Sequence, residues 1–296
     1  MKTTSARLLF FASASILLPV STLSASVTID WVTVGNAGNA ADTTGYGAVA
    51  YEYQIGKYEV TNAQYGAFLN AAAQTDSYGL YNTSMSSFGI TRSGSSGSYT
   101  YSVTGGLENR PVVFVSWFDA ARMANWMVNG QGGGSTETGA YTLNGATSGI
   151  VQANAGAQVY IPTENEWYKA AYYNGATSTY SLFPNGQDTI TAADANYSGS
   201  SSTNVGSYSG DPSAYGTFDQ GGNVWEWNDA VAGSSRGRRG GSWSHSGNFL
   251  RSSLRLVADP SLEDASIGFR FASVPEPSSL VLSVLASGVV LLRRKR

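Results

Sequence analysis

The chain has 296 residues, enough for one large domain or two small ones. Only 12% of the residues are charged, whereas 12% are aromatic and 35 are glycine. This aromatic content excludes a disordered chain, because disordered chains have too few such residues to build a core. The chain contains no cysteine, which excludes both a disulfide framework and thiolate chemistry. The composition is typical of a loop-rich exported protein.

Residues 1–25 have the pattern of a signal peptide. Lys2 and Arg7 make the start positive, and residues 8–20 form an apolar segment. Small residues follow at positions 21–26, and cleavage is expected near Ala25 or Ser26. The alternative is a buried first helix, but strand-like residues 27–31 begin at once. We therefore expect a protein that is exported across a membrane.

Three helices are predicted from capping boxes, in which a serine or threonine is followed three residues later by an acid or amide. The pairs are Thr61 with Gln64, Ser116 with Asp119, and Thr163 with Glu166. Apolar residues at helical spacing follow each pair. Extended apolar runs precede them at residues 51–60, 111–115 and 159–162, and the first of these alternates like a half-buried strand. Long Gly/Ser/Asn stretches between these units are expected to be surface loops.

The chain ends in a three-part tail over residues 274–296. A Val-Pro-Glu-Pro run is followed by an apolar segment, residues 280–292, and then by four basic residues. The apolar segment is shorter than the roughly 20 residues that span a bilayer, but its flanks can extend it. The positive-inside rule keeps such a basic end in the cytoplasm. We expect a transmembrane segment, because a core helix fits poorly with four terminal charges.

This tail resembles the PEP-CTERM sorting signal of Gram-negative bacteria. The resemblance implies transient anchoring in the inner membrane and cleavage near the Pro-Glu-Pro run by an exosortase. The cell surface or the medium is then the expected destination. The two ends hold six of the 17 basic residues and one of the 20 acidic residues, so residues 27–274 carry a formal net charge of −8. This acidic domain argues against nucleic acid as a partner.

Several ordered motifs carry a second resemblance. They are Ile55–Tyr65, Arg110–Ala120, Ile161–Trp167, Gly222–Trp227, Arg239–Trp243 and Ile267–Arg270. They resemble the motifs of the formylglycine-generating enzyme, or sulfatase-modifying factor, family. The resemblance implies a single α+β domain over residues 27–273, related to C-type lectins. Such a domain has short strands, about three helices and many long loops.

The chemistry of that family depends on residues that this chain lacks. Characterised members oxidise a substrate cysteine through a cysteine pair, and the resemblance places that pair at His245 and Leu250. The related ergothioneine-type iron sulfoxide synthases use three histidines from an added helical domain, whereas this chain has one histidine. His245 is interpreted as a loop residue in preference to a proton-transfer group or metal ligand, because a catalytic histidine needs an orienting partner. No catalytic residue and no redox metal are therefore expected.

The last quarter of the domain is rich in arginine, and two interpretations remain open. The residues are Arg238, Arg239, Arg251, Arg255 and Arg270. They could form a basic floor for an anionic ligand. They could also form internal ion pairs with Asp and Glu, a role for which arginine is well suited.

Calcium is the metal that the sequence predicts. The run from Asp219 to Glu226 offers two carboxylates and intervening main-chain carbonyls, which are oxygen ligands of the kind calcium prefers. By resemblance, the family's ligands correspond to the Asp219 side chain, the Gly222 and Val224 carbonyls, and Glu226. A second family site begins at Asn196, but this chain is shorter where its other ligands would fall. The alternative for Glu226 is a buried carboxylate paired with arginine.

These observations predict an exported, non-catalytic surface or matrix protein that is stabilised by calcium. The scaffold motifs are intact, and the known redox ligands are missing. The relationship to lectins implies a glycan or peptide ligand, for which the Tyr-rich loops could supply stacking faces. The alternative is a metal-dependent oxidase or oxygenase, with copper or non-heme iron held by rearranged ligands.

Overall fold

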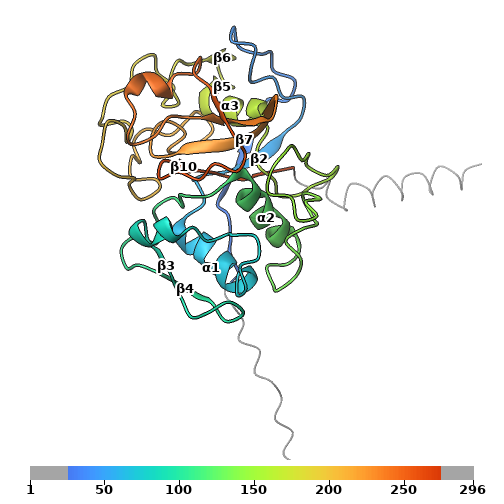
Figure 1. Cartoon of the computed structure of the whole chain (residues 1–296). Helices are drawn as coiled ribbons and strands as arrows, with labels where there is room; N and C mark the ends of the chain where they lie inside the picture. The colour runs from blue at the N-terminus through green and yellow to red at the C-terminus, as the bar shows by residue number, and fades with distance from the viewer. Residues whose placement is uncertain (1–25, 275–296) are drawn as a thin grey trace, which may run out of the picture.

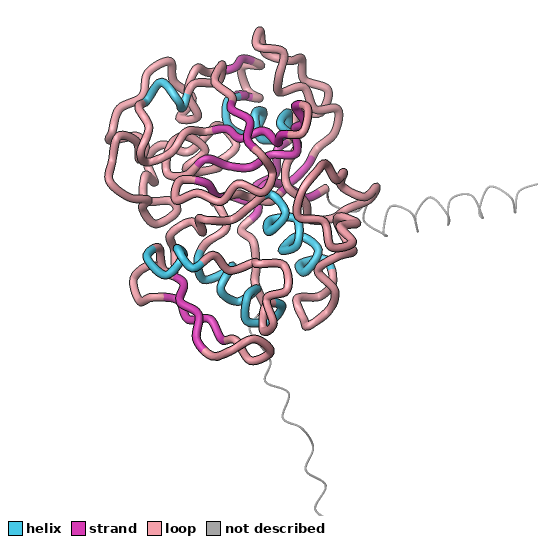
Figure 2. Tube along the Cα trace, in the orientation of Figure 1, coloured by secondary structure: helices cyan, strands magenta, loops and turns pink. Residues whose placement is uncertain are grey.

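The computed structural model describes residues 26–274 (Figure 1). Loops and turns make up most of the trace, and the helices and strands between them are short (Figure 2). The predicted signal peptide and nearly all of the predicted sorting tail lie outside the described residues. Within residues 26–274, no helix is both long and apolar enough to cross a bilayer.

The three predicted helices are confirmed, and each begins at its capping box. They are α1 (Asn62–Ala72), α2 (Trp117–Val128) and α3 (Glu164–Tyr172). In each case the N-cap side chain accepts the backbone N–H of the third helical residue, whose own side chain binds the N-cap backbone. Two short 3-10 helices, η1 (Thr83–Ser87) and η2 (Gly247–Leu250), lie in the loops.

Two small sheets form the centre of the domain. The first has the order β1 (Trp31–Val34), β2 (Tyr53–Gly56), β11 (Ala272–Ser273). The second has the order β10 (Ile267–Gly268), β7 (Trp225–Ala232), β8 (Ser235–Arg239), β9 (Leu256–Ala258). All neighbouring strands are antiparallel except β10 and β7, which are parallel. The pairing of β11 with β2 brings the two ends of the domain together.

Two further hairpins lie at the periphery. They are β3 (Ile90–Ser93) with β4 (Thr100–Val103), and β5 (Tyr173–Asn174) with β6 (Thr179–Tyr180). In Figure 1, α1, α2 and the β3–β4 hairpin form one end of the molecule, and α3, β7 and β10 lie toward the other. This mixture of helices and short, mostly antiparallel strands confirms the predicted α+β class.

The extended apolar runs before α2 and α3 do not form strands. Residues 111–115 contribute only one isolated bridge, between Pro111 and Thr61, because Phe114 has a φ of 58° that breaks the extended run. Before α3, one bridge joins Tyr160 to Ala272 and no ladder follows. The predicted strand over residues 51–60 shortens to β2, after which the chain turns into α1.

Tryptophans fill the core. Trp117, Trp167, Trp225 and Trp227 are fully buried, and the Trp227 indole N–H donates to the Val115 carbonyl at 3.0 Å. Side chains of this size remove more apolar surface from water than any others. Trp225 and Trp227 therefore belong to the core of the domain.

Candidate functional site: a buried carboxylate cluster beside an acidic groove

A buried ion pair lies at the centre of the cluster. Glu226 on β7 and Arg270, between β10 and β11, are both fully buried. Arg270 Nε donates to Glu226 Oε2 and Arg270 Nη2 donates to Glu226 Oε1, both at 2.6 Å. The Trp167 indole N–H donates to the same Oε2 at 2.7 Å. The pairing of Glu226 with an arginine, one of the two interpretations drawn from the sequence, is therefore present.

Glu59 is a second buried carboxylate, in the segment between β2 and α1. It is 2% exposed, and its Oε1 accepts from Asn223 Nδ2 at 3.0 Å. Its Oε2 has no hydrogen-bond partner in the described part of the chain. Burial, together with the nearby charge of Asp219, raises the pKa of Glu59 well above its usual range, and Arg270 opposes the shift.

Asp219 is the third carboxylate, in the loop that precedes β7. Its Oδ2 accepts from the Gly206 N–H at 2.6 Å, and it forms no ion pair with any residue in 26–274. Burial raises the pKa of Asp219 to about 6, and the charge of Glu226 adds to this rise. The Gly206 N–H and Arg270 act in the opposite direction.

The cluster therefore holds three carboxylates, and its one arginine is bound to Glu226. Buried carboxylates without a paired cation favour either a proton or a bound cation. Glu59 and Asp219 are the two members that lack an ionic partner. Sequence reasoning identified Asp219 but missed Glu59, which lay in the Ile55–Tyr65 motif and was used there only to identify the fold.

The remaining predicted metal ligands meet around Asn223. The Asn196 carbonyl accepts the Asn223 N–H at 2.8 Å, and Asn196 Nδ2 lies 3.3 Å from Asn223 Oδ1. Gly222 has a φ of 87° and packs against the Asn196 main chain. Val224 is fully buried immediately before β7. Since Asn223 also binds Glu59, it links the predicted ligand set to the unpaired carboxylate.

The predicted calcium ligands differ in whether they are open to an ion. Asp219 offers a buried carboxylate without an ionic partner, in a loop whose main-chain carbonyls can also act as ligands. Both oxygens of Glu226 are already bound by Arg270, so this residue is a poor open ligand in the present arrangement. Residues 26–274 contain no group of three or more His, Asp or Glu side chains placed to hold a metal. A calcium ion here would depend mainly on Asp219 and main-chain oxygens.

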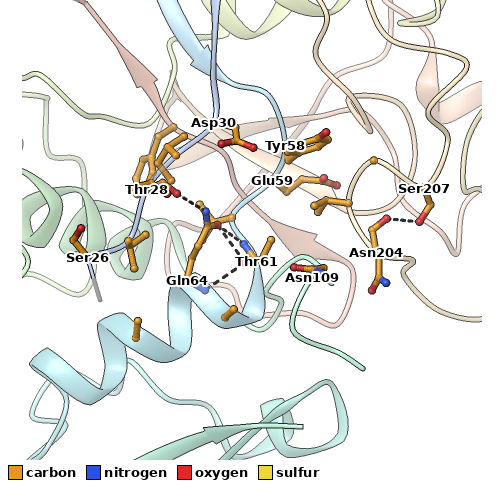
Figure 3. Close-up of a pocket in the computed structure, with 18 residues that line it drawn as sticks. Ser26, Thr28, Asp30, Tyr58, Glu59, Thr61, Gln64, Asn109, Asn204 and Ser207 are labelled. Carbon is orange, nitrogen blue, oxygen red and sulfur yellow. Dashed lines mark hydrogen bonds between the residues drawn. The ribbon is translucent and has the colours of Figure 1, made fainter. Parts of the chain in front are cut away.

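A groove of about 800 Å³ opens on the Glu59 side of the cluster. Its walls are residues 26–30, residues 58–61, the first turns of α1 and residues 204–207 (Figure 3). Among its described lining residues, Asp30 and Glu59 carry carboxyl groups and none is Lys, Arg or His, so we call the groove acidic. Asn109 and Asn204 add amide side chains at its edge.

His245 and Leu250 occupy the positions that correspond to the family's cysteine pair. Leu250 is fully buried at the end of η2. His245 lies in a bend before η2, as expected, and its ring packs edge-on against Trp225 with centroids 5.4 Å apart. Its Nδ1 lies 2.7 Å from Ser242 Oγ, an orienting partner that the sequence did not reveal. Burial and the charge of Arg238 lower the pKa of His245, so the neutral imidazole is favoured.

Three of the five C-terminal arginines form internal ion pairs. Arg239 and Arg255 both bind Glu164, at 2.7 and 2.8 Å, and Arg270 binds Glu226. Arg251 is exposed and stacks over the Phe183 ring. The internal interpretation is therefore confirmed for these three residues, and none of the described residues that line the groove is an arginine.

The ordered motifs and this fold agree with the family that a comparison with known protein families finds. The family model described as "Sulfatase-modifying factor enzyme 1-like domain" matches residues 32–274, and the chain belongs to this family. It is 26% identical over 251 residues to hercynine oxygenase of Mycobacterium tuberculosis, covering 74% of this chain and 52% of that protein. The chain is also 33% identical over 144 residues to hercynine oxygenase of Mycolicibacterium thermoresistibile, covering 40% of this chain and 32% of that protein. The chain thus spans about half the length of these relatives, or less.

Solved structures show the same fold. CarF superposes with a TM-score of 0.57 at 24% identity, covering 84% of this chain and 99% of CarF. Treponema denticola variable protein 1 superposes with a TM-score of 0.58 at 23% identity, covering 85% of this chain and 97% of that protein. At these identities the similarity concerns the fold alone.

Proposed function

We propose that this chain is an exported, non-catalytic member of the sulfatase-modifying factor family that binds a glycan or peptide ligand. One observation carries the proposal. The positions of the family's cysteine pair are filled by Leu250, buried in the core, and by His245, packed against Trp225, while the scaffold around them is intact. Neither side chain can supply thiolate chemistry. The acidic groove is the proposed binding site.

Export and surface location are part of the same proposal. They rest on the signal-peptide pattern of residues 1–25 and on the sorting-tail pattern of residues 274–296. The expected partners are an exosortase at the tail and, transiently, the inner membrane. The acidic domain makes nucleic acid an unsuitable ligand.

A structural calcium ion is the second part of the proposal. Asp219 is its main side-chain ligand, with the Gly222 and Val224 carbonyls and the Asn196 side chain as further candidates. Glu226 contributes negative charge to the site while it remains paired with Arg270. The support is the excess of buried carboxylate over arginine in the cluster.

Removal of calcium is expected to lower the melting temperature. A ligand present at 100 times its dissociation constant stabilises a protein by about 2.7 kcal/mol, which corresponds to a shift of roughly 5–10 °C for a domain of this size. Differential scanning fluorimetry with and without a calcium chelator measures the shift. Asp219→Ala should abolish the sensitivity to chelation, whereas the matched exposed variant Asp188→Ala should retain it. An unchanged melting temperature in the wild type would rule out this site.

A metal-dependent oxidase or oxygenase is the second candidate function. The similarity to proteins named hercynine oxygenase favours it. In this chain the only imidazole ligand available is His245, so the remaining ligands would have to be oxygen donors. Copper or iron bound to the purified protein would distinguish this candidate from the first.

A further inference from the structure

Residues 27–30 continue β1 as an extended edge. Their main-chain contacts alternate between two sides, as in a β-strand. On one side, Val27 exchanges two hydrogen bonds with the Gln131 side chain. On the other side, the Thr28 carbonyl accepts from Gln64 Nε2 at 2.8 Å (Figure 3). Because Gln64 lines the groove, this second side of the edge faces the groove.

The strand that would cover this edge turns away. Its last main-chain bond runs from the Lys57 N–H to the Asp30 carbonyl at 2.7 Å, after which the chain turns into α1. The Thr28 N–H has no hydrogen-bond partner among residues 26–274. In a β-strand the N–H and C=O of one residue point to the same side, so this N–H is directed toward the groove. Thr28 is exposed and lines the groove, which therefore occupies the place of a continued β2 strand.

Two free amide side chains belong to the opposite wall of the groove. Asn109 and Asn204 lie on separate loops, which are joined by the hydrogen bond from the Val205 N–H to the Asn109 carbonyl at 2.8 Å. Both side chains are exposed, and neither amide group has a hydrogen-bond partner in the described part of the chain. Figure 3 shows them across the groove from Thr28. An amide offers both a donor and an acceptor, which are the two groups that a peptide main chain requires.

The rest of the accessible lining suits the side chains of a peptide that is not acidic. It includes apolar residues that are partly or fully exposed, namely Ile29, Ala63, Ala67 and Val205. Alternate side chains of an extended peptide point to opposite faces, so every second one can pack on such a surface. The exposed Asp30 carboxylate, with no Lys, Arg or His among the described lining residues, disfavours an acidic peptide.

A free strand edge facing free amides is an arrangement for main-chain recognition. We propose that the groove binds an extended peptide segment of a partner protein by β-strand addition to residues 27–30. A carbonyl of the peptide accepts the Thr28 N–H, and Asn109 and Asn204 bind the opposite edge of the peptide. In this mode the main-chain hydrogen bonds give affinity and the side-chain contacts give specificity. A glycan would use the amides and leave the strand edge unpaired. This proposal rests on the proposed ligand-binding function and names its ligand class.

Peptide selection on the full-length purified protein is the first test. The probe is a phage-displayed library of random seven-residue peptides. Ala63→Trp places a large ring on the exposed start of α1 without changing the charge, and it serves for counter-selection. The selected peptides are expected to contain few Asp or Glu residues and to bind Ala63→Trp at least about tenfold more weakly than the wild type. Selection of no peptide, or only of peptides that bind both proteins equally, would overturn the proposal.

Thr28→Pro and its matched control Thr28→Ala test the strand edge itself. Both variants lose the threonine side chain, but only proline lacks the N–H. A synthetic copy of a selected peptide, titrated by calorimetry, should bind Thr28→Pro about fivefold more weakly than Thr28→Ala, the effect of one hydrogen bond. Equal affinities would contradict strand addition.

Hydrogen exchange in the wild type supplies a second measurement that needs no variant. The Thr28 amide should exchange at least about tenfold more slowly when the peptide is bound, as measured by NMR. An unchanged exchange rate at saturating peptide would exclude a hydrogen bond from this amide and overturn the proposal.

The failure of this proposal is distinguishable from failure of the proposed function. Binding of cellohexaose, a neutral oligosaccharide, that is lost in Ala63→Trp but equal in Thr28→Pro and Thr28→Ala would overturn the peptide assignment and leave a ligand-binding module. A redox metal bound in stoichiometric amount would overturn the non-catalytic function whatever the peptides do. Sensitivity to chelation tests Asp219 and should persist in Thr28→Pro.

Discussion

Arg270→Met is expected to lower the free energy of unfolding by about 3–5 kcal/mol, the usual cost of removing one partner from a buried ion pair. Glu226 would be left as a bare charge in the core, beside Glu59 and Asp219. The variant would also lose the hydrogen bonds from Arg270 to the Gly56 and Phe218 carbonyls, at 2.9 and 2.8 Å. Chemical denaturation monitored by tryptophan fluorescence measures the loss.

The matched control for this variant is Arg251→Met. Arg251 is exposed, makes no ion pair among residues 26–274 and stacks only on Phe183, so its replacement should cost little. The double variant Glu226→Gln/Arg270→Met should be less destabilised than Arg270→Met alone, because it leaves no unpaired charge at this position. If Arg270→Met were as stable as the control, Arg270 would not be the structural partner of Glu226.

Gly222→Ala is expected to destabilise the domain by about 3 kcal/mol or more. Gly222 has a φ of 87°, which is strained for any residue with a side chain. A Cβ atom there would lie 2.3 Å from the Asn196 carbonyl oxygen, and this clash is with main chain that has no rotamer to change. The same movement would disturb the Asn196 to Asn223 contact and, through Asn223, Glu59. Thermal melting of the purified variant measures the effect.

Gly210→Ala provides the control for the glycine variant. A Cβ atom at Gly210 meets no atom within 4 Å, and Gly210 is outside the positive-φ glycines of the described chain. Its replacement should therefore change the melting temperature little. A Gly222→Ala variant as stable as this control would show that the close packing of Gly222 on Asn196 does not exist in solution.

The helices could be predicted because their signals are local. Each capping box places its donor and acceptor three residues apart, so the sequence contains the complete interaction. The conformation of the apolar runs before α2 and α3 could not be predicted in the same way. The apolar run at residues 111–115 has a strand-like composition, but packing places Phe114 in a left-handed conformation that no local pattern announces.

The residues of the cluster could be predicted to lie together only where one segment of the sequence contains them. Asp219, Gly222, Val224 and Glu226 fall in one short run, so their proximity follows from the sequence. Glu59 comes from a segment 164 residues before its partner Asn223, and burial of its carboxylate depends on the fold. The internal pairing of Arg239 and Arg255 with Glu164 is also long-range, over 75 and 91 residues. The sequence therefore allowed two roles for these arginines, a basic floor for an anionic ligand and internal ion pairs, and could not decide between them.

The metal content of protein collected from the culture medium tests the central claim most directly. Elemental analysis, with the intact mass of the same sample to define its ends, is expected to find calcium near one ion per chain. Copper and iron should be well below one per chain, both in the wild type and in His245→Ala. Copper or iron near one per chain in the wild type, and lost in His245→Ala, would contradict a non-catalytic domain and would identify a redox centre at His245.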